Sequence, residues 1–115
     1  MNLFVHVVET EFGVPAANLH VALRRCTGGL NWIDLGKGHT GPDGQLMAWQ
    51  GTLSVPTTFW IEFDIDRFYS TLGSVPLFPK AIVVLRVGDT DDDLHLHLLI
   101  SPNLLLNYRA SSDER

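Results

Sequence analysis

Cysteine and charge are both scarce in this chain. Cys26 is the only cysteine among 115 residues, which excludes an intrachain disulfide. Charged residues make up 18% of the chain, below the usual share of about 25%, so we expect another subunit to cover part of the surface. The net charge is −5, and Arg24 and Arg25 are the only adjacent basic pair. Because nucleic-acid phosphates require clustered Lys and Arg, this balance argues against a nucleic-acid partner.

Long hydrophobic runs are also missing. No apolar run approaches the ~20 residues that span a bilayer, so no membrane partner is expected. Residues 1–8 alternate and lack the basic start and continuous apolar stretch of a signal peptide. We therefore expect a soluble, cytoplasmic protein. Hydrophobic residues make up 45% of the chain, enough for one folded domain and too many for disorder.

Short alternating or β-branched segments, separated by turn residues, dominate the chain. A helix is expected from Asp64, as its N-cap, to Leu72, with Gly73 ending it. About eight strands and one short helix predict an all-β, two-sheet sandwich over residues 1–111, with residues 112–115 as a C-terminal tail. The expected strands are residues 3–8, 19–25, 32–35, 45–49, 57–63, 81–87, 94–100 and 104–108.

Two histidines, His95 and His97, lie two residues apart in the apolar segment 94–100. On a strand this spacing places both side chains on one face. Imidazoles titrate near neutral pH, so such a face suits acid–base catalysis, although the spacing fits two exposed or interface histidines equally well. Zinc is a further alternative, with His6 as a third ligand. Because no paired cysteine or spaced carboxylate accompanies these histidines, we expect no metal.

Three successive leucines, Leu104 to Leu106, interrupt the alternation in the last expected strand. A strand that is apolar on both faces needs cover on both. In a domain this small, its own core covers one face and a second subunit covers the other. The segment therefore predicts a homo-oligomer.

A series of short motifs runs along nearly the whole chain. They are His6–Thr10, Gly13–Ala17, Thr40–Gly44, Phe68–Tyr69, Leu77–Pro79, His95–Pro102 and Tyr108–Ser111. In this order they resemble the transthyretin-like family and, within it, the 5-hydroxyisourate hydrolases. The resemblance implies an eight-stranded sandwich with one short helix, and a homotetramer whose active sites lie in a channel between dimers.

The reaction that the resemblance implies is cofactor-free hydrolysis of 5-hydroxyisourate, which opens its six-membered ring in urate breakdown. Water must attack a ring carbonyl, so a base must take its proton, and the developing oxyanion needs a donor or cation. By position, His6 and His95 match the family histidines that activate water and polarise the substrate. Ser111, from the terminal motif, orients water or substrate. Arg109 and Tyr108 are assigned to the substrate-binding wall, Tyr108 mainly by packing.

Two departures from the family pattern bear on the reaction. Gln45 stands where the family has Arg, and His97 replaces a Pro and adds a third titratable group; both are assigned to substrate binding. These changes favour, as an alternative, an enzyme of the same fold acting on another heterocyclic substrate. A non-enzymatic carrier of a small aromatic ligand is the third hypothesis. The combination of His6, His95 and Arg109 counts against it, because apolar ligand binding does not need these groups.

Overall fold

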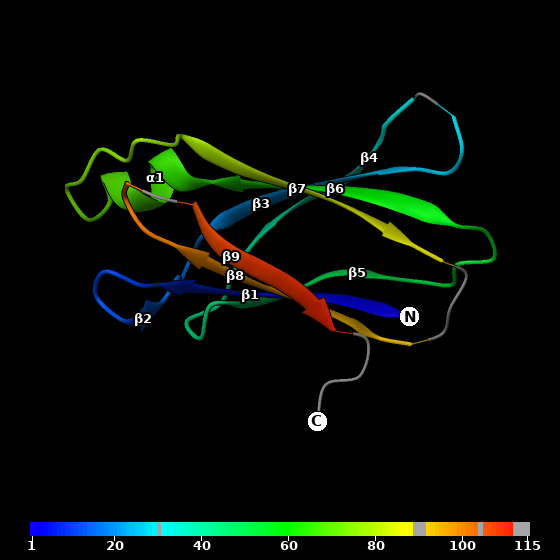
Figure 1. Cartoon of the computed structure of the whole chain (residues 1–115), viewed down its shortest axis with the longest axis horizontal. Helices are drawn as coiled ribbons and strands as arrows, with labels where there is room; N and C mark the ends of the chain where they lie inside the picture. Colours follow the sequence, from blue (N-terminus) through cyan, green and yellow to red (C-terminus); the bar gives the residue numbers. More distant parts are fainter. Residues whose placement is uncertain (30, 89–91, 104, 112–115) are drawn as a thin grey trace.

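The computed structural model describes residues 1–29, 31–88, 92–103 and 105–111, the last range by its backbone course alone. Two β-sheets pack face to face, and one short helix lies at one end of the sandwich (Figure 1). The predicted all-β class is confirmed. The elements are β1 (Asn2–Glu9), β2 (Val14–Pro15), β3 (His20–Cys26), β4 (Ile33–His39), β5 (Gln45–Gln50), β6 (Thr57–Asp64), α1 (Ile65–Ser70), β7 (Lys80–Val87), β8 (Leu94–Ile100) and β9 (Leu105–Ser111).

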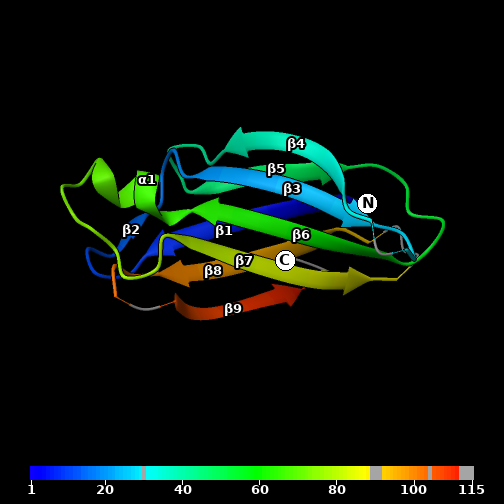
Figure 2. The same ribbon diagram turned by 90° about the horizontal axis from the view of Figure 1, so that it is seen from above.

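The two sheets differ in how their strands are ordered. Sheet I has the order β2-β1-β8-β9, and β5 pairs with β1 on the same edge as β2. Sheet II has the order β4-β3-β6-β7. Only the β1–β8 pair is parallel among the described strands. Figure 2 shows β7 and β9 along one side of the sandwich and β4 and β5 along the other.

Period-two alternation decides which side chains enter the core. Along β1 every second residue is buried, from Leu3 to Glu9, while Phe4 and His6 between them face outward. The same alternation runs along β6 and, from His95 to Ile100, along β8. The largest buried apolar side chains are Tyr69, Phe59, Phe63, Leu3, Leu19, Ile61, Ile65, Leu96, Leu98 and Ile100.

Three strands differ from the expectations by more than one residue. β4 continues to His39 instead of stopping at Leu35, because its glycine-containing half pairs with β3 across a bulge. β2, which lies outside the expected strands, adds a two-residue pair to the edge of β1. β9 runs to Ser111 rather than residue 108. In each case the pairing partner, which local sequence does not specify, sets the limit.

The helix follows its predicted signals closely. The Asp64 carboxylate accepts a hydrogen bond from the Arg67 N–H at 3.1 Å, as expected of an N-cap. The helix ends at Ser70, two residues before the expected end, and the chain then turns at Gly73, whose φ is +74°. Its Ile65 and Tyr69 side chains are fully buried. The described chain contains no helix of the length and apolarity that a membrane crossing requires.

A buried carboxylate ties the helix to the end of β1. Glu9 is fully buried and accepts hydrogen bonds from the Tyr69 hydroxyl and from the Phe12 N–H. Burial, followed by the hydrogen bond and the charge of Glu9, raises the pKa of the Tyr69 hydroxyl far above its usual range. Thr10 continues the attachment, since both its N–H and its hydroxyl donate to the Ile100 carbonyl at 2.9 Å.

We expect the free energy of unfolding to fall as the pH rises above about 10. Below that pH the Tyr69 hydroxyl is protonated in both states. Above it the hydroxyl ionises only in the unfolded chain, which then binds fewer protons, so each pH unit removes up to about 1.4 kcal/mol. Urea denaturation on either side of pH 10 measures this slope. Tyr69→Phe lacks the ionising group and serves as the control; equal slopes in the two proteins would contradict the assignment.

Candidate active site

The outward face of sheet I gathers the histidines singled out in the sequence. His6 on β1 and His95 and His97 on β8 are all half-buried there. Because β1 and β8 are adjacent, the three imidazoles lie on one face, with His6 opposite His97 and His95 opposite Phe4. The structure thus places His95 and His97 on one face, as their spacing predicts, and adds His6 to it. We call this surface the histidine face, made of Phe4, His6, Gln45, His95 and His97.

His6 has His97, not His95, as its direct neighbour. The parallel register pairs these two residues across the strands. Their rings meet edge to face, with centroids 5.7 Å apart and an interplanar angle of 72°. His97, which departs from the family motif, is therefore the residue in contact with His6 on β1.

His95 is held by an aromatic neighbour that the sequence analysis did not assign to the site. Its ring stacks on Phe4, with centroids 4.8 Å apart and an interplanar angle of 14°. This contact fixes the orientation of the imidazole. The alternation of residues 3–8 contained the signal, because it places Phe4 on the same face as His6.

Gln45 begins β5 directly beside His6, with which it pairs in the antiparallel register. A tight turn sets its backbone: the Gln45 N–H donates to Asp43 Oδ1 at 3.0 Å, and its carbonyl accepts from the Gly41 N–H at 2.8 Å. Gly44 has a φ of +76°, and a Cβ there would clash with the Val7 carbonyl oxygen. Gln45 itself is exposed.

Thr40 anchors this turn to the rest of the domain, a role that the sequence analysis did not assign. Its hydroxyl is buried, donates to the Ala16 carbonyl at 2.5 Å and accepts from the Leu19 N–H at 2.9 Å. The threonine and the glycine of the Thr40–Gly44 motif therefore both serve to bring Gln45 to the edge of the histidine face.

The residues expected from the terminal motif lie on β9, next to β8. The register pairs Arg109 with His97, Ser111 with His95 and Tyr108 with Leu98. Side chains from residue 104 onward lie outside the described part of the chain, as does the expected tail at 112–115. The side chains of the leucine segment at 104–106, from which a homo-oligomer was predicted, also lie outside the described part of the chain. The backbone thus brings the Arg109 and Ser111 positions beside the two histidines of β8.

The histidine face offers groups that exchange protons and donate hydrogen bonds. Imidazoles accept and release protons near neutral pH, and the Gln45 amide donates without carrying charge. Within the described ranges, no three His, Cys, Asp or Glu side chains are grouped to hold a metal ion. This set of groups can support acid–base chemistry on a polar substrate.

Curated relatives resemble the chain over almost its whole length. The 5-hydroxyisourate hydrolase of Mus musculus is 29% identical over 111 residues, which cover 95% of this chain and 94% of the relative. The 5-hydroxyisourate hydrolase 2 of Rhizobium meliloti is 31% identical over 116 residues, covering 95% of each. The 5-hydroxyisourate hydrolase of Salmonella typhimurium is 27% identical, covering 95% of this chain and 80% of the relative.

Solved structures resemble it in fold. Transthyretin from Sparus aurata superposes with a TM-score of 0.84 at 23% identity, covering 96% of this chain and 97% of the other. Sea bream transthyretin in complex with thyroxine gives a TM-score of 0.80 at 22% identity, covering 95% and 92%. The transthyretin-like sandwich expected from the motifs is confirmed. The model of the HIUase/Transthyretin family matches residues 3–110, and the chain therefore belongs to that family.

Proposed function

We propose that this protein hydrolyses 5-hydroxyisourate, opening its six-membered ring without a cofactor. Full-length relatives carrying the name of this activity support the proposal. The observation that carries it is the gathering of His6, His95 and His97 on one half-buried face. A protein that only needs to bind an apolar ligand has no use for three adjacent imidazoles.

The reaction needs one proton taken from water and one given to the leaving nitrogen. The imidazole of His6 or of His95 accepts the water proton as the water oxygen bonds to the ring carbonyl carbon. The carbon–nitrogen bond then breaks, and the imidazolium returns the proton to the nitrogen. The single ring-opened product holds all the atoms of substrate and water. Ser111, at the register position opposite His95, orients the attacking water.

The developing oxyanion needs hydrogen-bond donors. Arg109 occupies the register position opposite His97, and Gln45 pairs with His6. Arg109 supplies the charge, and Gln45 supplies a neutral amide donor. His97 contacts His6 and contributes to the substrate-binding wall.

We propose further that the chain assembles into a homotetramer that covers the histidine face. In the described chain β7 pairs only with β6, and β9 only with β8, so each sheet has an unpaired edge on the same side of the sandwich (Figure 2). On β7 the outward Ile82 and Val84 are 43% and 49% exposed. Pairing of these edges with a second copy extends both sheets, and two such dimers then enclose the face in a channel.

A carrier function is the second candidate, because one structural neighbour is a transthyretin in complex with thyroxine. The hydrolase and carrier functions can be distinguished by generating 5-hydroxyisourate with urate oxidase and following its ultraviolet decay. The hydrolase proposal predicts faster decay at micromolar protein. Thyroxine binding without any acceleration would favour the carrier. A protein inactive on 5-hydroxyisourate but active on another cyclic amide would instead be a same-fold enzyme with a different substrate.

A further inference from the structure

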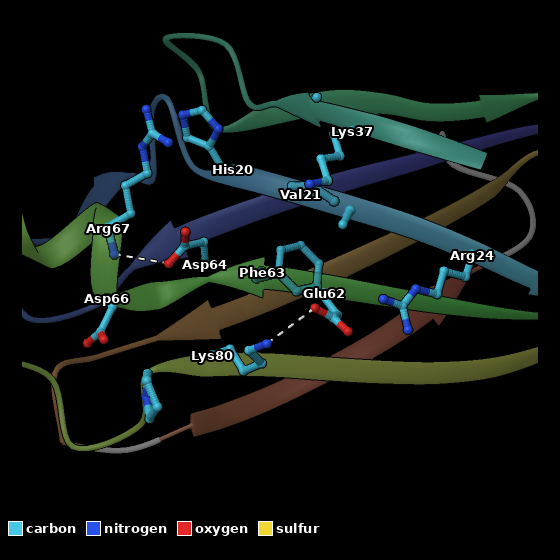
Figure 3. Close-up of a pocket in the computed structure, with 13 residues that line it drawn as sticks. His20, Val21, Arg24, Lys37, Glu62, Phe63, Asp64, Asp66, Arg67 and Lys80 are labelled. Carbon is cyan, nitrogen blue, oxygen red and sulfur yellow. Dashed lines mark hydrogen bonds and ion pairs between the residues drawn. The ribbon is translucent and has the colours of Figure 1, made fainter. Parts of the chain in front are cut away.

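The outward face of sheet II, on the opposite side of the sandwich from the histidine face, contains a hollow of about 420 Å³. It lies over β3, β4 and β6 and reaches α1 (Figure 3). None of the residues assigned to the proposed hydrolysis lines it. Its charged and titratable lining residues are His20, Arg24, Lys37, Glu62, Asp64, Asp66, Arg67 and Lys80.

A small residue at the centre of the sheet creates the hollow. Ala22 pairs with Lys37 on β4 and with Glu62 on β6, so it lies between two long side chains. Along β3 the same face continues with His20 and Arg24, two residues away on either side. The methyl group of Ala22 fills little of the space that its four longer neighbours surround.

The charges on one side of the hollow are already balanced. Glu62 accepts a hydrogen bond from Trp60 Nε1 at 2.7 Å and pairs with Lys80 Nζ at 3.5 Å. The Trp60 hydrogen bond, helped by the charges of Lys80 and Arg24, lowers the pKa of the Glu62 carboxyl. Arg24 in turn pairs with Asp34 at 3.0 Å. Glu62 is therefore an ionised acceptor at neutral pH.

The other side holds two cationic side chains, Lys37 and Arg67, that have no ion pair among the residues the structure describes. In Figure 3, Arg67 and His20 lie at one end of the hollow, and Lys37 lies farther along the same side. The Asp64 carboxylate already accepts from the Arg67 backbone N–H, and Asp66 extends away from the Arg67 guanidinium.

We propose that this hollow binds a small metabolite that carries a phosphate or carboxylate group. Arg67 and Lys37 hold the oxyanion, Arg67 as a planar fork and Lys37 as a point charge. His20 donates a further hydrogen bond, and Glu62 accepts one from the other end of the ligand. Cationic donors at one side and an ionised acceptor at the other match a ligand with an anionic head and a donor group. The site is separate from the proposed active site and is expected to fill independently of it.

The test follows the Trp60 indole N–H by nuclear magnetic resonance, because this group donates to Glu62 at the edge of the hollow. Inorganic phosphate and succinate are titrated separately at constant ionic strength. A saturable shift with phosphate identifies a phosphate site, and one with succinate a carboxylate site. A shift that grows linearly with both anions would overturn the proposal.

Variants locate the binding within the hollow. Lys37→Ala and Arg67→Ala are each expected to weaken it about tenfold or more, because each removes a charge-assisted contact. Arg86→Ala removes the same charge from an exposed position on sheet II that does not line the hollow, and it should change the affinity less than about twofold. The spectra of the variants also report whether they remain folded. An equal loss in Arg86→Ala would mean nonspecific attraction and contradict the site.

Discussion

Replacing His6 or His95 with alanine is expected to lower kcat/KM for 5-hydroxyisourate by about 10²- to 10⁴-fold, the usual contribution of a positioned acid or base. Both imidazoles lie half-buried on the outward face of sheet I, so their loss leaves the core intact. Stopped-flow measurement of the ultraviolet decay gives the ratio of the wild-type and variant kcat/KM values directly. The effect of the two changes together should be much smaller than the product of the single effects, because the residues act as a unit.

His39→Ala is the matched control for these variants. His39 is an exposed imidazole on β4 of sheet II, away from the histidine face, and its ring neighbours His20. We expect its removal to leave kcat/KM within about twofold of the wild-type value, as for surface changes remote from a site. If His6→Ala and His95→Ala behave like His39→Ala, the histidine face is not where hydrolysis takes place.

The second large effect concerns the charge that Gln45 lacks. Gln45→Arg is expected to raise kcat/KM for 5-hydroxyisourate by about 10- to 150-fold, because it adds a charge-assisted hydrogen bond worth about 1.5–3 kcal/mol in the transition state. The position suits the change, since Gln45 is exposed and pairs directly with His6. If the added cation stabilises only the transition state, kcat should rise with little change in KM.

Gln50→Arg places the same charge at the other end of β5, where Gln50 pairs with Asn2. It should leave the kinetics nearly unchanged, so a gain in both variants would indicate general electrostatic attraction of the substrate. A Gln45→Arg variant that loses activity would instead indicate that the histidine face has adapted to a substrate for which a neutral donor is required.

The parts of this site that sequence reasoning predicts are those that local rules govern. The two-residue repeat of a strand places His95 and His97 on one face, and the Asp64 side chain caps the helix through a contact three residues away. Similarly, the Thr40–Gly44 motif marks a turn whose geometry requires a glycine at its end. Each of these features depends on residues close in the chain.

The features that could not be predicted from the sequence depend on which strands become neighbours. Parallel pairing of β1 with β8 sets His6 opposite His97 and Phe4 against His95, although the two strands lie at opposite ends of the sequence. The hollow on sheet II likewise combines Lys37 and Arg67, which come from a strand and a helix with no common motif. Neither arrangement corresponds to a residue spacing that can be recognised in the sequence.

Hydrolysis of 5-hydroxyisourate by the histidine face is tested most directly by the decay of freshly generated substrate in three parallel reactions: buffer, wild-type protein, and a His6→Ala/His95→Ala double variant of matched oligomeric state. We expect a wild-type rate that is proportional to protein concentration and saturates with substrate, while the double variant stays near the buffer rate. Wild-type decay equal to that in buffer would contradict the proposed hydrolysis.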